Sequence, residues 1–102
     1  MTGYAFVWEY VVRAERVEDF YRTYGPHGAW VQLFSQAEGY VRTELLRDET
    51  RPNRFVTIDI WTARDAHDAF RLRFAEDYGT LDAQCEALTL SERFIGDFSV
   101  ES

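Results

Sequence analysis

Asp59 is a carboxylate that the sequence places among aromatic side chains on one face of a predicted strand. The run Arg54–Trp61 alternates along a predicted strand, so one face carries Phe55, Thr57, Asp59 and Trp61. A carboxylate between aromatic side chains suits neither a dry core nor an ordinary wet surface. Asp59 could act there as a general base toward a hydroxyl group of a ligand, or accept a hydrogen bond from one.

Arg42 is the expected partner of Asp59. If the strand before the turn pairs regularly with the strand after it, Arg42 lies opposite Asp59 and Tyr40 lies opposite Trp61. Two interpretations follow. The guanidinium could stabilise an anion that forms on a ligand, or the two charges could form a cross-strand ion pair without any chemistry.

Other reactive side chains are few. His67, early in a predicted helix, is either a solvated surface residue or a proton shuttle at a pocket mouth. His27 is predicted to be a loop residue without a special task, and Cys85 a buried, inert thiol. These three residues match no metal-site spacing, and no phosphate-binding loop is present, so no bound cofactor is expected.

Composition narrows the class of protein. The 102 residues are 46% hydrophobic, which predicts one folded domain over 1–102. The net charge of −7, with arginine as the only basic residue type and no basic stripe, excludes nucleic acid as a partner. No apolar run approaches the roughly 20 residues that cross a bilayer, so no membrane association is expected. The single cysteine favours a cytoplasmic location.

Hydrophobic periodicity predicts an α+β fold. The expected strands cover 4–12, 40–47, 54–61 and 92–100, and the expected helices cover 15–24, 30–37 and most of 62–88. Thr62 and Asp65 resemble a capping box at the start of the last helical region, which is expected to kink near Gly79. The order is the ferredoxin-like βαββαβ arrangement, a four-stranded antiparallel sheet with the helices on one face.

The two faces of this sheet differ in chemistry. The helices are expected to cover the aliphatic face, with Val7, Val11, Val41, Leu45, Val56, Ile58 and Ile60. The other face then gathers Phe6, Trp8, Tyr10, Tyr40, Phe55 and Trp61. Such an aromatic patch exceeds what a monomer exposes. We therefore expect a homodimer whose two sheets enclose a cavity for a small aromatic molecule.

Short segments along nearly the whole chain resemble the antibiotic biosynthesis monooxygenase superfamily of dimeric α+β barrels. They are Trp8-Glu9-Tyr10, Gly39-Tyr40, Glu44-Leu45, Asp59-Ile60-Trp61 and Ala69-Phe70. The resemblance implies a cofactor-independent monooxygenase, an oxidoreductase acting on a planar phenolic, quinol or polyketide-like aromatic. In such chemistry the substrate anion itself passes an electron to O₂.

The resemblance also has limits at particular positions. Trp61 matches a pocket tryptophan of several members, but Thr57 and His67 stand where an aromatic-polyketide member has asparagine and tyrosine. Trp8 and Arg71 stand where haem-degrading members need asparagine and histidine. Haem degradation is therefore not expected.

Together these arguments assign the candidate site. The catalytic candidates are Asp59, Arg42, Trp61 and His67, and the substrate-binding candidates are Trp8, Phe6, Tyr40, Thr57 and Phe55. Two alternatives remain open. The protein could be a non-catalytic dimeric binding module for an aromatic metabolite, or the partner's side chains could fill the aromatic face and leave no pocket.

Overall fold

Strand β3 (Arg54–Trp61) decides which face of the sheet the helices cover, because its burial alternates along its length. The computed structural model describes residues 3–101. The buried residues of β3 are Phe55, Thr57, Asp59 and Trp61, whereas those between them stay partly exposed. The strand therefore turns its mixed aromatic and polar face toward the helices.

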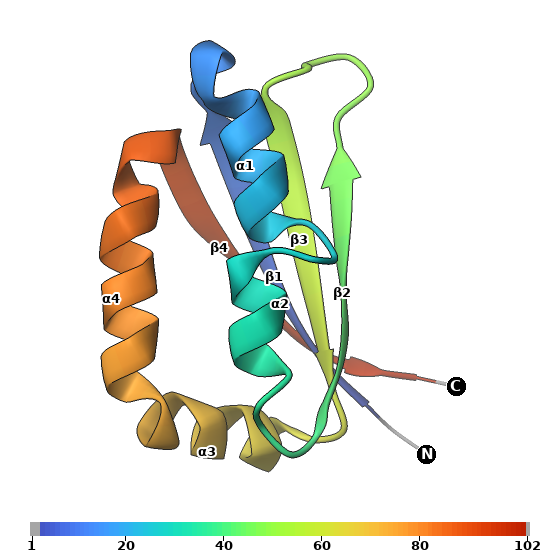
Figure 1. The fold of residues 1–102 in the computed structure, drawn as a ribbon. Coiled ribbons are helices and arrows are strands. Elements are labelled where there is room, and N and C mark those ends of the chain that lie inside the picture. Colours follow the sequence, from blue (N-terminus) through green and yellow to red (C-terminus); the bar gives the residue numbers. More distant parts are fainter. Residues whose placement is uncertain (1–2, 102) are drawn as a thin grey trace.

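Four antiparallel strands form the sheet, in the order β2-β3-β1-β4. The other strands are β1 (Gly3–Val12), β2 (Tyr40–Arg47) and β4 (Thr89–Val100). One face carries α1 (Val17–Tyr24), α2 (Ala29–Phe34), α3 (Arg64–Arg73) and α4 (Ala75–Cys85), as Figure 1 shows. Two 3₁₀ turns, η1 (Ala14–Arg16) and η2 (Glu86–Leu88), precede α1 and β4. This arrangement confirms the predicted fold class. No helix in the described range is long and apolar enough to cross a membrane.

The prediction that the helices cover the aliphatic face is wrong. The helices themselves present buried aromatic rings: Phe20, Tyr24, Trp30, Phe34 and Phe70. These rings pack against the aromatic face of the sheet, for example Phe20 on Phe55 with ring centroids 4.9 Å apart. Aromatic side chains bury the most apolar area per residue, so joining the two aromatic layers stabilises the fold more than covering short aliphatic chains.

The pairing of β2 with β3 departs from the regular register at one point. Tyr40 lies opposite Trp61, as the sequence predicts. A bulge between Tyr40 and Arg42 then shifts the rest of β2 by one residue. As a result Thr43, and not Arg42, lies opposite Asp59. A shift of one residue moves each following side chain to the other face.

The predicted Arg42–Asp59 pair is therefore wrong. Arg42 lies opposite Ile60 on the open face of the sheet, and its guanidinium pairs with Glu44 at 3.2 Å. Neither interpretation of Arg42 given above applies, because the arginine and Asp59 are on opposite faces. A bulge of this kind leaves no mark in the hydrophobic pattern of β2.

Two predicted helix signals are also wrong. Helix α3 begins after Ala63 without a side-chain cap, and Thr62, the residue after β3, donates its backbone N–H to the Gly39 carbonyl at 2.7 Å. The break between α3 and α4 falls at Phe74, and Gly79 lies inside α4.

Gly39 fixes the start of β2 against α3. Its φ is +89°, and a Cβ atom added there would lie 2.5 Å from the Cβ atom of Ala66 and 2.8 Å from Thr62 Oγ1. A left-handed backbone and so close an approach both require glycine.

Gly39→Ala is expected to lower the free energy of unfolding by about 1–3 kcal/mol, since backbone strain adds to the clash with α3. Gly79→Ala is the matched control: apart from the neighbouring residues and backbone of its own helix, no atom lies within 4 Å of its added methyl group. The control is expected to raise the free energy of unfolding by up to about 1 kcal/mol, because alanine favours a helix interior. Urea titration measures both, and equal stability of the two variants would contradict this account.

Candidate functional site

A cavity of about 260 Å³ lies between the covered face of the sheet and the helices. Nine of its 16 lining residues are Phe, Tyr or Trp, which gives it mostly flat, apolar walls. The chain's own helices cover the aromatic face of the sheet, so the expectation that two sheets enclose an aromatic cavity is wrong. The alternative in which a partner fills the aromatic face is wrong for the same reason.

Asp59 is the buried acid of this cavity. Its side chain lines the cavity, and the residue is only 8% exposed. Thr43 Oγ1 donates to Asp59 Oδ1 at 2.7 Å. Burial raises the pKa of Asp59 to about 6, although the Thr43 hydrogen bond acts in the opposite direction. At neutral pH the group is thus a carboxylate that is more basic than an exposed one.

His67 lies inside the molecule, so its interpretation as a solvated surface residue is wrong. Its ring stacks near Phe6, with ring centroids 4.3 Å apart, and meets Trp61 edge-on at 5.5 Å. Burial lowers its pKa, which outweighs the opposite effect of Asp68 at 3.3 Å. The imidazole is therefore neutral at neutral pH and can exchange a proton within the cavity.

Trp61 provides a hydrogen-bond donor that the described chain does not use. The residue is 1% exposed, and its indole N–H has no acceptor among residues 3–101. Leaving a buried donor unpaired costs about 1–3 kcal/mol. Such a donor beside a cavity is the kind of group that a ligand oxygen would satisfy.

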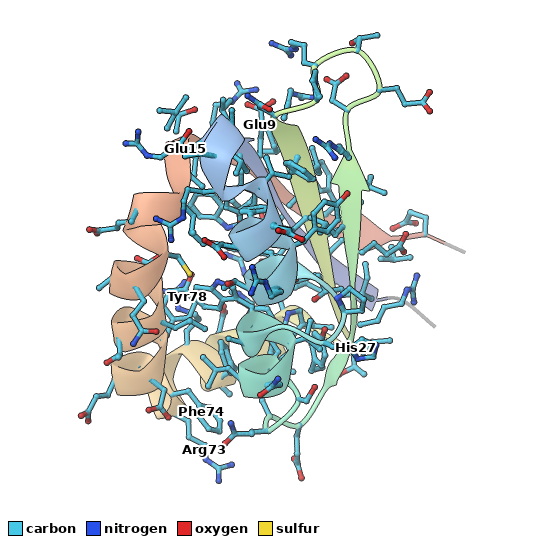
Figure 2. The ribbon with its side chains drawn as sticks, turned by 45° about the horizontal axis from the view of Figure 1, so that its top comes forward. Glu9, Glu15, His27, Arg73, Phe74 and Tyr78 are labelled. Atoms are coloured by element: carbon cyan, nitrogen blue, oxygen red, sulfur yellow. The ribbon has the colours of Figure 1, made fainter. Side chains whose placement is uncertain are left out.

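Charged residues stand where the cavity meets solvent. These rim residues are Arg71, Asp82 and Glu92, which line the cavity and remain at least partly exposed. The Arg71 guanidinium lies 3.9 Å from the ring centroid of Tyr78, which Figure 2 shows on the inner side of α4. Burial raises the pKa of Glu92, and the charge of Asp82 adds to that effect.

Six of the predicted site residues come together in the cavity: Asp59, Trp61, His67, Trp8, Phe6 and Thr57. Three do not line it. Arg42 is on the open face, Phe55 is fully buried against α1, and Tyr40 lies behind Thr43 with their hydroxyl oxygens 2.7 Å apart.

The sequence reasoning missed the contribution of α4 and β4. Tyr78 and Asp82 are four residues apart, so they project from one face of α4 into the cavity. Glu92 lies opposite Tyr10 in the pairing of β4 with β1. A helical spacing of polar and aromatic residues in α4 was the available signal. The predicted burial of Cys85 is confirmed, and His27 lies exposed in the loop between α1 and α2 (Figure 2).

Fold and cavity together define a small α+β protein whose sheet and helices enclose an aromatic pocket within one chain. The family model described as antibiotic biosynthesis monooxygenase matches residues 7–73. The chain therefore belongs to the antibiotic biosynthesis monooxygenase family, as its resemblance to that family predicts.

Several solved structures share the fold. SnoaB, a cofactor-independent oxygenase from Streptomyces nogalater, is 23% identical with a TM-score of 0.69, covering 100% of this chain and 94% of SnoaB. PA3566 from Pseudomonas aeruginosa is 16% identical with a TM-score of 0.69, covering 100% of this chain and 95% of PA3566. Rv0793 from Mycobacterium tuberculosis is 15% identical with a TM-score of 0.68, over 98% and 94% of the two chains. No curated protein gives a significant match to the sequence.

Asp59→Asn is expected to stabilise the protein at high pH. Because the folded-state pKa is raised to about 6, the folded protein binds the proton more tightly than the unfolded chain. The free energy of unfolding therefore falls as pH rises from about 4 to about 6, by up to about 3 kcal/mol. The variant escapes this cost, so its gain is largest at pH 8 and absent near pH 3.

Urea unfolding at both pH values measures this gain, with Glu49→Gln in the exposed turn as the control. The control is expected to change stability by less than about 0.5 kcal/mol at either pH. A destabilised Asp59→Asn protein at pH 8 would mean that the carboxylate is structurally needed.

Proposed function

We propose that this protein is a cofactor-independent monooxygenase acting on a planar phenolic or quinol-like aromatic molecule. The observation that carries the proposal is Asp59, a buried carboxylate with a raised pKa in an aromatic-walled cavity. Membership of the antibiotic biosynthesis monooxygenase family supports it. The name of SnoaB, a cofactor-independent oxygenase of the same fold, agrees with this chemistry.

In this proposal Asp59 removes the proton of the phenolic hydroxyl. The resulting anion is electron-rich enough to pass an electron to O₂, and the two radicals then combine at a ring carbon that carries hydrogen. One oxygen atom stays on that carbon as a carbonyl, and the other leaves as water. The substrate supplies all four electrons, as in a phenol plus O₂ giving a quinone plus water.

The remaining cavity residues have supporting roles. The unpaired Trp61 N–H donates to the phenolate oxygen, which takes over the role that the sequence assigned to Arg42. Trp8 and Phe6 form flat walls against which a ring stacks. Neutral His67 passes a proton to the oxygen atom that leaves as water. Tight aromatic packing keeps bulk water from the anion.

The charges around the cavity favour a ligand without negative groups. Three carboxylates line it, Asp59 and the two acidic rim residues, against the single guanidinium of Arg71. A carboxylated or phosphorylated ring would be repelled by the two acidic rim residues and again by Asp59. We therefore favour an uncharged hydroxylated ring system over an anionic one.

Oxygen uptake with a panel of benzene and naphthalene hydroquinones tests the activity. Consumption of O₂ is expected above the spontaneous rate, rising with pH through about 6 as Asp59 ionises. Adding a carboxylate to the same ring is expected to weaken binding at least tenfold. Uptake at the spontaneous rate across the whole panel would contradict the proposal.

A non-catalytic binding module is the alternative, and Asp59→Asn separates it from an enzyme. In an oxygenase the variant is expected to lose turnover by 10²–10⁴-fold while keeping ligand affinity within a few-fold, because only proton removal is lost. In a binding module there is no turnover to lose. Stopped-flow oxidation and anaerobic fluorescence titration measure the two quantities separately.

A homodimer through the open face of the sheet is part of the same proposal. This face carries aliphatic residues of the central strands and the exposed Leu46, Phe98 and Val100. Its main charges neutralise one another, since Glu9 accepts from Arg54 at 2.6 Å and from Arg93 at 3.2 Å. A partly exposed apolar face of this kind is typical of an interface between two copies.

Sedimentation equilibrium at micromolar concentration is expected to give twice the chain mass of 12.0 kDa. Ile58→Glu is expected to return the protein to the monomer mass, because it places an unpaired charge in the apolar interface. Leu72→Glu is the matched control on α3, where the wild-type side chain is 83% exposed, and is expected to stay dimeric. A wild-type monomer would contradict this part of the proposal.

A further inference from the structure

No Arg or His of residues 3–101 pairs with Asp59; its partner is the hydroxyl of Thr43, which in turn bonds the hydroxyl of Tyr40. Thr43 Oγ1 donates to Asp59 Oδ1 at 2.7 Å, and Tyr40 Oη lies 2.7 Å from Thr43 Oγ1. An ionised carboxylate can only accept, so the single hydroxyl hydrogen of Thr43 goes to Asp59. Tyr40 is then the donor to Thr43, and both hydrogens point toward the carboxylate.

The bulge in β2 makes this series of hydroxyl groups possible. In a regular strand, residues three apart project from opposite faces, and Tyr40 and Thr43 could not meet. The bulge between Tyr40 and Arg42 adds one residue, so both hydroxyl groups reach the covered face. The hydrogen bond from the backbone N–H of Thr62 to the Gly39 carbonyl holds the chain in place immediately before the bulge.

The two oxygens of Asp59 have different surroundings. Oδ1 accepts from Thr43, whereas Oδ2 takes no hydrogen bond from residues 3–101. Asp59 also lines the cavity. One oxygen is therefore held by the strand and the other is available to a ligand.

We propose that Tyr40 and Thr43 are positioning residues for Asp59: Thr43 holds Oδ1, Tyr40 supports Thr43, and together they favour the ionised carboxylate and leave Oδ2 for the substrate hydroxyl. This inference rests on the proposed role of Asp59 as the base. Hydrogen bonds in series polarise one another, so the Tyr40 hydroxyl strengthens the Thr43 bond without touching Asp59.

No group around Asp59 in the described part of the chain carries a positive charge that could favour its ionised form. The titratable residues that face it from the neighbouring elements are Tyr10 of β1, Tyr40 of β2, His67 of α3 and Tyr78 of α4. Burial raises the pKa of the three tyrosines and lowers that of His67, so all four are neutral at pH 7. The charged groups of the cavity lie at its rim.

Thr43→Val tests the inference, because valine keeps the shape of threonine but cannot donate. Carboxyl ¹³C NMR of the free protein follows the titration of Asp59 without any substrate. We expect Thr43→Val to raise the Asp59 pKa by about one unit, and Tyr40→Phe to raise it by less. Thr43→Ser keeps the hydroxyl and is expected to titrate like wild type.

Thr57→Val is the matched control for the titration. Thr57 lies on the same covered face and is more deeply buried than Thr43, but its hydroxyl lies 3.4 Å from the Tyr10 hydroxyl and does not bond Asp59. We expect it to leave the Asp59 pKa unchanged. Equal titration of Asp59 in wild type, Thr43→Val and Thr57→Val would overturn the inference.

Activity then separates this inference from the proposed function. If the protein turns over a hydroquinone, the pH profile of kcat/KM must shift upward in Thr43→Val and return in Thr43→Ser. A shifted NMR titration without any turnover would overturn the proposed function but leave the positioning of Asp59 standing. A shifted profile without a shifted NMR titration would overturn the positioning role.

Discussion

The burial of one carboxylate inside an aromatic layer is the constraint on which the rest of the structure depends. Asp59 is only 8% exposed, and no cation of the described chain neutralises it. Burial alone would favour its neutral form, while the Thr43 hydroxyl of β2 favours the charged form. The balance leaves a base whose pKa of about 6 lies near neutral pH. A carboxylate on the surface would avoid the desolvation free energy that burial of Asp59 costs, so stability alone does not explain its position.

The two faces of β3 carry different side chains, one set lining the cavity and the other forming the proposed interface. The covered face of β3 supplies the acid and the indole of the cavity, and the open face supplies Val56, Ile58 and Ile60. Because strand residues alternate, a change of register by one residue would exchange the two sets. The bulge in β2 uses this property locally: it removes Arg42 from the cavity and brings Thr43 in. A neutral donor beside Asp59 keeps the carboxylate basic, whereas an arginine would have made it a weaker base.

Periodicity was sufficient to predict the element order, the ranges of β2 and β3 and the grouping of Asp59 with Trp61. It could not tell which face the helices cover, since both faces of the sheet are apolar and only the aromatic rings of α1 and α2 decide between them. The bulge depends on backbone geometry at Gly39 and Tyr40 and has no hydrophobic signature. The spacing of Tyr78 and Asp82 in α4 was an available signal, whereas the contribution of Glu92 depends on the register of β4 against β1, which no local pattern records.

The most direct test is to observe the tryptophan indoles while a planar hydroquinone binds without oxygen. Trp8 and Trp61 line the single-chain cavity. Under argon, their ¹⁵N indole signals are predicted to shift in step with ligand concentration, and the methyl signals of Ile58 and Ile60 to stay in place. Shifts confined to those methyl groups, with both indole signals unmoved, would place the ligand on the open face and contradict the account.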